Sequence, residues 1–157
     1  LLLVGDDDGK INFSKKLKRK IKKLQLTNRI IFCGNLNDMP AVYSIADVVL
    51  STSIEPEAFG RISAEASAMT KPIISSNHGG SREIIENGMT GWLIEPSNAE
   101  MLADKIQEVF RLPQEKKDTI GMNARRRVME KFCLNEMLKK TMSVYEYLLS
   151  TKKNFDN

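Results

Sequence analysis

Two glutamates frame a short glycine-containing stretch of the chain, where the sequence runs Glu57-Ala-Phe-Gly-Arg-Ile-Ser-Ala-Glu65. A helix that begins after Gly60 would leave its first backbone N–H groups without a partner and with a partial positive charge. Such a helix start binds anions, and a glycine beside it lets the anion approach the backbone closely. A ligand with hydroxyls at both ends and phosphate in the middle would match Glu57, the helix start and Glu65 in turn. A nucleotide-sugar has this layout.

The same two acids have a simpler interpretation, in which Glu57 only complements the helix dipole and Glu65 is a solvated helix residue. Ile62, Ala66 and Met69 fall on one face of the helix and are expected to pack on a sheet. Glu65 would then lie at the edge of the buried stripe, where a partly desolvated carboxylate needs hydrogen-bond donors. Spacing alone leaves both interpretations open.

Length and composition are those of a folded globular chain. The 157 residues fit one domain, and 41% hydrophobic and 28% charged residues are ordinary values. No apolar stretch approaches the ~20 residues that cross a bilayer. Cys33 and Cys133 match no metal or redox spacing and are expected to be small core residues in a reducing cytosol. His78 is the one histidine of the chain, which excludes a multi-histidine metal site.

Short apolar runs that alternate with helical patterns predict an α/β fold, a Rossmann-like parallel sheet flanked by helices, with extra helices at the C-terminal end. The expected strands are residues 1–4, 29–33, 47–50, 72–75 and 92–94, the first of them buried on both faces. The expected helices are residues 38–46, 61–69 and 81–86, one in the basic stretch that contains residues 17–24, and three after residue 97. Ligands of such sheets bind at the carboxyl ends of the strands, in this chain the loops of residues 5–10, 34–37, 51–60 and 76–81.

Cap residues predict where two of these helices begin. Ser14 is a candidate cap for the basic helix, and Ser97 with Glu100 three residues later forms a capping-box pattern. Leu102, Ile106, Val109 and Phe110 are the expected buried face of the helix that follows Ser97.

The spacing of the two acids in "EAFGRISAE" resembles the Glu-x7-Glu motif of the retaining glycosyltransferases of family 4, the group 1 transferases with the GT-B fold. The likeness extends along almost the whole chain in the family's order. It is carried by "LLLVGDDDG", "NRIIFCGNL", "MPAVYSIADVVLSTS" and "KPIISSNHGGSREIIENGMTGWLIEP".

The resemblance implies a role for each matching residue. Glu57 would contact hydroxyls of the transferred sugar and Glu65 the ribose hydroxyls. The sugar and the diphosphate would face the main-chain N–H groups around Phe59, Gly60, Arg61 and Ile62. The base would lie near Gly34, Asn35 and Leu36. The donor would be a UDP- or GDP-sugar, and neither a metal nor another cofactor would be required.

The family pattern also implies that residues 1–157 form a single nucleotide-sugar-binding domain, the C-terminal half of a two-domain enzyme. We expect a fragment that lacks the acceptor-binding N-terminal domain and the first strand of this domain. In the family that earlier region carries an Arg and a Lys that neutralise the diphosphate, and nothing before Leu1 supplies them here. Arg61 stands where many relatives have an aliphatic residue, so it either adds positive charge near the phosphates or points to solvent.

Two further segments have chemistry-bearing residues. The stretch "GDDDGK" at residues 5–10 is one residue short of a phosphate-binding loop and lacks the Ser or Thr that follows its lysine. An Asp-x-Asp pair after a strand is alternatively typical of Mg²⁺ ligands or a phosphatase nucleophile, but the family resemblance accounts for it as a turn.

His78 precedes a Gly-Gly turn in a predicted ligand loop, where we expect it to line the donor site rather than act as a general base. Glu83, which opens the next helix, either complements its dipole or, as the family resemblance implies, faces the same cleft.

Seven basic residues lie between Lys15 and Lys23. The run is expected to be the solvated face of an amphipathic helix, and its alternative is contact with an anionic membrane, which would suit a lipid-linked saccharide acceptor. No aromatic platform supports nucleic-acid binding. The expected function is therefore a cytoplasmic glycosyltransferase, placed at the inner face of the membrane if the basic run binds lipid, in cell-envelope polysaccharide or glycolipid synthesis. The alternatives are a non-catalytic nucleotide-binding module and a nucleotide-sugar epimerase.

Overall fold

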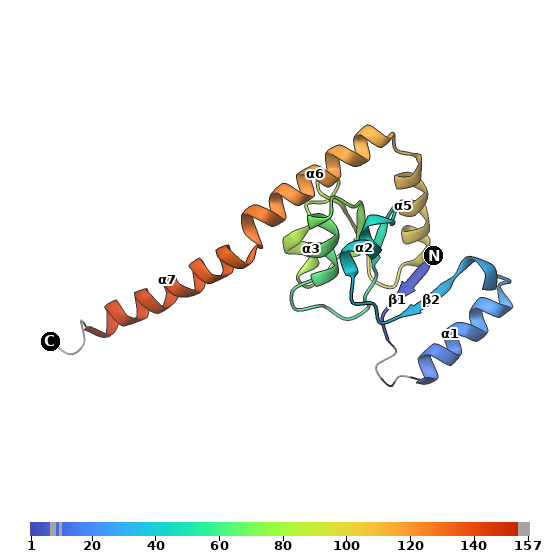
Figure 1. The fold of residues 1–157 in the computed structure, drawn as a ribbon, viewed down its shortest axis with the longest axis horizontal. Coiled ribbons are helices and arrows are strands. Elements are labelled where there is room, and N and C mark those ends of the chain that lie inside the picture. Colours follow the sequence, from blue (N-terminus) through green and yellow to red (C-terminus); the bar gives the residue numbers. More distant parts are fainter. Residues whose placement is uncertain (7–8, 10, 154–157) are drawn as a thin grey trace. The chain divides into compact units, whose positions relative to one another are not determined.

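The computed structural model describes residues 1–6, 9 and 11–153, and these group into two compact units, Leu1–Val42 and Tyr43–Asn157 (Figure 1). The boundary between the units falls inside α2, Met39–Ser44. Parallel strands with intervening helices make up each unit, so the predicted α/β fold class is confirmed. The prediction of a single domain over residues 1–157 stays a prediction.

The N-terminal unit is a small β-α-β arrangement. Strand β1 (Leu2–Val4) pairs in parallel with β2 (Ile31–Gly34), and they are connected by α1 (Ile11–Lys23) and a single 3-10 turn at Thr27–Arg29. Ile21 of α1 is buried. The first strand is not buried on both faces as predicted, because Leu2 is exposed in the described structure.

The larger unit is built on three parallel strands in the order β3-β4-β5, which are Val49–Ser51, Ile73–Ser76 and Trp92–Ile94. The central strand β4 is buried along its whole length. The helices of this unit are α3 (Arg61–Ala68), α4 (Ser81–Ile84), α5 (Ala99–Arg111), α6 (Gln114–Lys131) and α7 (Leu134–Lys153).

The core of the larger unit lies where α5 and α6 meet β4 and β5. Trp92 is buried there beside Ile74 and Val109. Phe110 was expected on the buried face of α5 but is 55% exposed. Val109 and Phe110 are adjacent in sequence, so their side chains point about 100° apart around the helix. Val109 therefore lies in the core and Phe110 does not.

Small residues, not aliphatic ones, form the buried face of α3. Ser63, Ala64, Ala66 and Ser67 are buried, whereas Ile62 is 39% exposed, which corrects the prediction that Ile62 packs on the sheet. These short side chains let α6 approach α3 closely. Just past the end of α3, a Cβ atom added at Gly121 of α6 would lie 2.2 Å from the backbone oxygen of Thr70.

Both predicted caps are wrong. Helix α5 is capped by Asn98, whose side-chain oxygen accepts a hydrogen bond from the Met101 backbone N–H at 2.9 Å. Ser97 lies one residue before that cap, in a left-handed backbone with φ of 60°. Ser14 lies inside α1, which already begins at Ile11.

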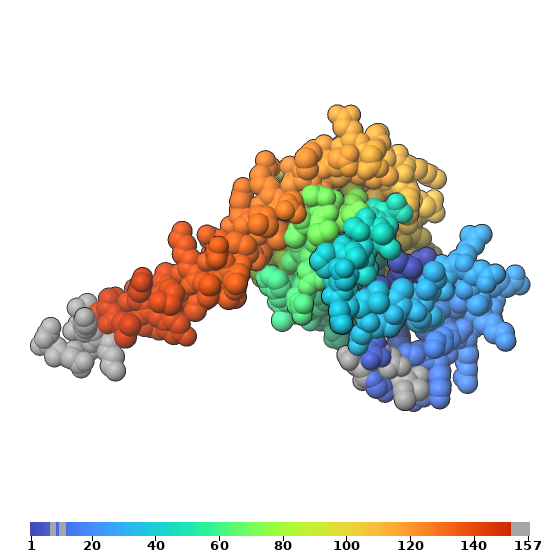
Figure 2. Space-filling view, in the orientation of Figure 1, coloured from blue at the N-terminus to red at the C-terminus, as the bar shows by residue number. Residues whose placement is uncertain are grey.

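Helix α7 keeps its large apolar side chains exposed. Leu138, Met142, Tyr145 and Leu149 repeat at helical spacing and are all exposed in the described structure. The atoms of α7 are drawn in red in Figure 2, and no other element of its unit covers them on this face. No helix in the part of the chain that the structure describes is both long enough and apolar enough to cross a bilayer.

Candidate functional site

The candidate site is built at the carboxyl ends of two neighbouring parallel strands. Strand β3 ends at Ser51 and leads into the loop of residues 52–60, and β4 ends at Ser76 and leads into residues 77–80. Ser51 and Ser75 are register partners, so the two loops leave the same edge of the sheet. Ligands of open α/β sheets bind at such an edge.

The two loops are joined by backbone contacts that require glycine. The Gly80 N–H donates to the Glu57 carbonyl at 2.8 Å. A Cβ atom at Gly80 would lie 2.1 Å from the carbonyl oxygen of Phe59, and one at Gly79 would lie 2.3 Å from that of Glu57. Two glycines in sequence therefore allow the second loop to pack directly on the backbone of the first, which fixes the position of Glu57.

Side chains add a second connection between the loops. The Ser53 hydroxyl donates to the half-buried Glu57 carboxylate, and His78 Nε2 lies 2.9 Å from the Ser53 carbonyl oxygen. A carbonyl only accepts, so Nε2 carries the proton and Nδ1 of a neutral imidazole is an acceptor. That Nδ1 atom is buried and has no hydrogen-bond partner among the described residues.

Gly60 forms the start of α3. It has a left-handed backbone with φ of 83°, and as the N-cap it has no side chain to accept from the first helical N–H groups. Below the helix start lies a buried hydroxyl cluster. The Ser81 hydroxyl lies 2.9 Å from Ser75 Oγ and 3.2 Å from Ser63 Oγ. The cluster connects α3, β4 and α4, so it fixes the direction in which the helix start faces.

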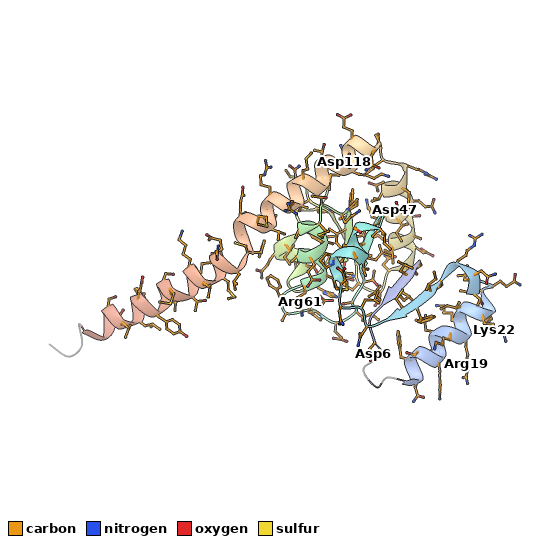
Figure 3. The ribbon with its side chains drawn as sticks, in the orientation of Figure 1. Asp6, Arg19, Lys22, Asp47, Arg61 and Asp118 are labelled. Atoms are coloured by element: carbon orange, nitrogen blue, oxygen red, sulfur yellow. The ribbon has the colours of Figure 1, made fainter. Side chains whose placement is uncertain are left out.

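Two donors hold the Glu65 carboxylate, one turn into α3. Arg61 Nη2 lies 3.1 Å from Oε1, and the Tyr43 hydroxyl donates to Oε2 at 2.9 Å. Arg61 is 84% exposed (Figure 3), and exposed pairs at this spacing contribute only ~0.3–0.5 kcal/mol. Tyr43 is 5% exposed, and burial, followed by its hydrogen bond to Glu65, raises the pKa of the Tyr43 phenol. Tyr43 therefore stays a proton donor to Glu65 at neutral pH.

An aromatic pair supports the other end of the motif. The Phe59 ring makes an edge contact with Phe132, with ring centroids 6.2 Å apart. The Arg127 guanidinium lies over the Phe132 ring and donates to the carbonyl oxygens of Glu83 and Ile84 at 2.7 and 2.8 Å. The junction of α6 and α7 thus packs against the loop that carries Glu57. The Glu83 side chain is exposed.

The residues predicted to lie near the base belong to the N-terminal unit. Gly34 has φ of 64° and accepts from the Gly5 N–H at 2.9 Å. The Asn35 side chain lies 3.4 Å from Asp6, and Leu36 is exposed. Their role beside a base stays a prediction.

Asp7, Asp8 and Lys10 of the stretch considered for metal or phosphate lie outside the described residues. Among the described residues, no three His, Cys, Asp or Glu side chains are grouped as metal ligands.

Comparison with known proteins decides the family. Residues 1–127 match the family model described as "Glycosyl transferases group 1". The chain belongs to this family of glycosyltransferases. The resemblance predicted from the sequence is therefore confirmed.

Three similar glycosyltransferases illustrate the relationship. N-acetyl-alpha-D-glucosaminyl L-malate synthase of Bacillus anthracis is 30% identical over 98% of this chain and 39% of its own length. The capsular polysaccharide biosynthesis glycosyltransferase CapM of Staphylococcus aureus is 33% identical over 76% of this chain and 31% of its own. The crystal structure of Anabaena HepE with UDP and glucose superposes with a TM-score of 0.84 at 33% identity, over 95% of this chain and 40% of that one. The chain thus spans about two fifths or less of the length of these transferases.

Sequence reasoning missed the residues that hold the two acids. Tyr43 and Ser53 contact Glu65 and Glu57, and Phe132 contacts Phe59 from far along the chain. The sequence could have indicated that Tyr43 has a polar partner. Tyr43 lies in a short, otherwise mostly apolar helix, and a buried tyrosine hydroxyl needs such a partner. Nothing in the spacing of Ser53 or Phe132 identifies their partners.

Proposed function

We propose that this chain binds the nucleotide-sugar donor of a retaining glycosyltransferase. The observation that carries the proposal is the pair of interlocked loops at the end of β3 and β4. They hold Glu57 beside the start of α3, with Glu65 one turn further along the helix. This chain order of acid, anion-binding helix start and acid matches the order of sugar, diphosphate and ribose in the donor.

In the proposed mechanism the protein stabilises the departing diphosphate and orients the sugar. The uncapped N–H groups at Gly60, Arg61 and Ile62 would stabilise the negative charge that develops on the leaving phosphate. Glu57 would accept hydrogen bonds from hydroxyls of the transferred sugar, and its connection through Ser53 to His78 would limit its movement.

The donor in this proposal is a UDP- or GDP-sugar, and binding measurements with UDP and GDP would show which base the site accepts. Glu65, accepting two ribose hydroxyls, would contribute ~1.5–3 kcal/mol to donor binding, or about ten- to over a hundredfold in affinity. Glu65→Ala is therefore expected to weaken UDP or GDP binding without unfolding the protein. Metal independence is also proposed, and undiminished transfer in excess EDTA would support it.

The acceptor is proposed to be a saccharide of the cell envelope, carried on a lipid. Support comes from the similarity to CapM and from the basic face of α1, on which Arg19 and Lys22 are exposed (Figure 3). A juxtamembrane basic residue contributes ~1 kcal/mol to binding an anionic surface. The enzyme would then act in the cytoplasm at the inner face of the membrane. Salt-sensitive binding to vesicles that contain phosphatidylglycerol, and not to neutral vesicles, would support this contact.

The proposed transfer is tested with the intact protein and candidate donors. We expect UDP or GDP to be released from its sugar at a rate that depends on an added acceptor, with the anomeric configuration retained in the product. A non-catalytic module would bind the nucleotide-sugar without cleaving the bond between the nucleotide and the sugar. An epimerase would convert the donor in the absence of any acceptor. Either result would overturn the proposal of transfer.

A further inference from the structure

We propose that Tyr43 is a positioning residue for donor binding, which fixes the Glu65 carboxylate so that its free acceptor sites face two neighbouring hydroxyls of the ribose. This inference rests on the proposed function, because it assumes that Glu65 meets the ribose of a nucleotide-sugar. A phenol outside the two-glutamate motif would thereby determine how well the diol is recognised.

The hydrogen bonds at Glu65 leave acceptor capacity for a diol. An ionised carboxylate has about four acceptor positions, two on each oxygen. Tyr43 occupies one position on Oε2, and Arg61 occupies one on Oε1. Each oxygen therefore retains an acceptor position. Two vicinal hydroxyls can fill these together, provided that the carboxylate plane does not rotate.

The two donors differ in how firmly they hold that plane. Arg61 is largely exposed on the same helix and has a long side chain, so it is free to exchange its carboxylate contact for water. Tyr43 is buried and reaches Glu65 from another element. A ring with only two side-chain torsions loses little freedom when it is held in place. Tyr43 is therefore the donor that pre-organises Glu65.

The backbone that carries Tyr43 is also fixed. The Ala46 N–H donates to the Tyr43 carbonyl oxygen at 3.1 Å, and Lys71 Nζ donates to the carbonyl oxygen of the next residue, Ser44, at 2.7 Å. Lys71 lies between α3 and β4. The end of α2 is thus tied to the segment that follows α3, which keeps the phenol in register with the helix that carries Glu65.

Binding energy is gained from pre-organisation because the ligand does not have to order the site. Without the Tyr43 hydroxyl, the Glu65 carboxylate would rotate among several orientations, of which few present both oxygens to a diol. The loss is specific to ligands with two ribose hydroxyls, since a ligand without them gains nothing from the orientation. This selectivity separates a positioning role from a general contribution to folding.

The test compares ribonucleotide and dideoxynucleotide binding in the intact protein. UDP and GDP, and the 2′,3′-dideoxy form of whichever binds, are titrated calorimetrically into wild type and Tyr43→Phe. The control variant is Tyr147→Phe, which removes an exposed hydroxyl from α7. We expect Tyr43→Phe to weaken ribonucleotide binding about five- to tenfold, to leave dideoxynucleotide binding unchanged, and to keep the wild-type circular dichroism. Tyr147→Phe should change neither affinity.

A double-mutant cycle with Glu65→Ala completes the test. If Tyr43 acts through Glu65, then Tyr43→Phe should have no further effect on ribonucleotide affinity once Glu65 is absent. Equal losses for both nucleotides in Tyr43→Phe, or no loss for either, would overturn the inference and leave the proposed function standing. A wild type that binds neither nucleotide, or shows no preference for the diol, would overturn the proposed function and this inference together.

Discussion

Replacing Gly80 by alanine should separate the two loops that form the candidate site. Gly80 has an ordinary right-handed backbone, with φ of −62° and ψ of −22°, so alanine costs nothing in local conformation. The difficulty is steric, because the new Cβ would lie 2.1 Å from the Phe59 carbonyl oxygen and 2.2 Å from its carbon. Both atoms are backbone, so the loops must move apart by more than about 1 Å to restore an ordinary contact of ~3.5 Å.

The expected cost has two parts of different size. Overpacking of this kind lowers the free energy of unfolding by ~1–3 kcal/mol. Alanine also restricts the unfolded chain more than glycine does, which offsets ~0.4–1 kcal/mol of that loss. A displacement of about 1 Å in a site that positions reactants lowers turnover by ~10²-fold. We therefore expect Gly80→Ala to fold, to lose ~1–2 kcal/mol of unfolding free energy, and to lose most of its transferase activity.

The assay measures kcat/KM and urea unfolding for Gly80→Ala in the intact protein. Gly88→Ala is the matched control, because Gly88 has φ of 79° but no heavy atom within 4 Å of its added Cβ. It should lose ~1 kcal/mol of stability from backbone strain and keep wild-type activity. If Gly80→Ala retains wild-type kcat/KM, the interlocked loops do not position the donor.

The other predictions concern single side chains. In the intact enzyme, Glu57→Gln should lower kcat about 10²-fold while UDP or GDP affinity changes little, because the sugar-free nucleotide does not reach Glu57; equal losses in kinetics and calorimetry would contradict this. The raised pKa of Tyr43 stabilises the fold fully below pH ~10 and progressively less above it. In urea unfolding, wild type should thus lose more stability than Tyr43→Phe between pH 9 and 11, and parallel curves would argue against the shift. Phe132→Leu removes the edge contact with Phe59 and should cost ~0.5–1.5 kcal/mol in unfolding free energy; an unchanged midpoint would count against that contact.

Much of the fold could be read from the sequence because its signals are local. Apolar runs such as Trp92–Ile94, and the alternation of strands and helices, depend on patterns a few residues long. The errors came where the structure departs from a local rule. Ser97 fits a capping box but adopts a left-handed backbone that places Asn98 at the cap. Ile62 fits a buried stripe, but close packing of α3 on α6 selects small residues for that face.

The sequence predicted the two acidic residues of the candidate site, but not the residues that contact the motif. Glu57 and Glu65 stand out through their spacing around Gly60, which is visible in one short segment. Tyr43 lies 22 residues from its partner Glu65, and Phe132 is further still from Phe59. Such contacts depend on how helices pack rather than on any pattern along the chain. The sequence therefore indicates candidate binding residues, and the structure adds the residues that hold their side chains in place.

A crystal structure of the intact protein with a bound UDP- or GDP-sugar would test the central claim most directly. We predict that the diphosphate accepts hydrogen bonds from the backbone N–H groups at Gly60, Arg61 and Ile62, with Glu57 contacting the sugar and Glu65 the ribose. A donor bound elsewhere on the chain, or a diphosphate more than hydrogen-bonding distance from the start of α3, would contradict it.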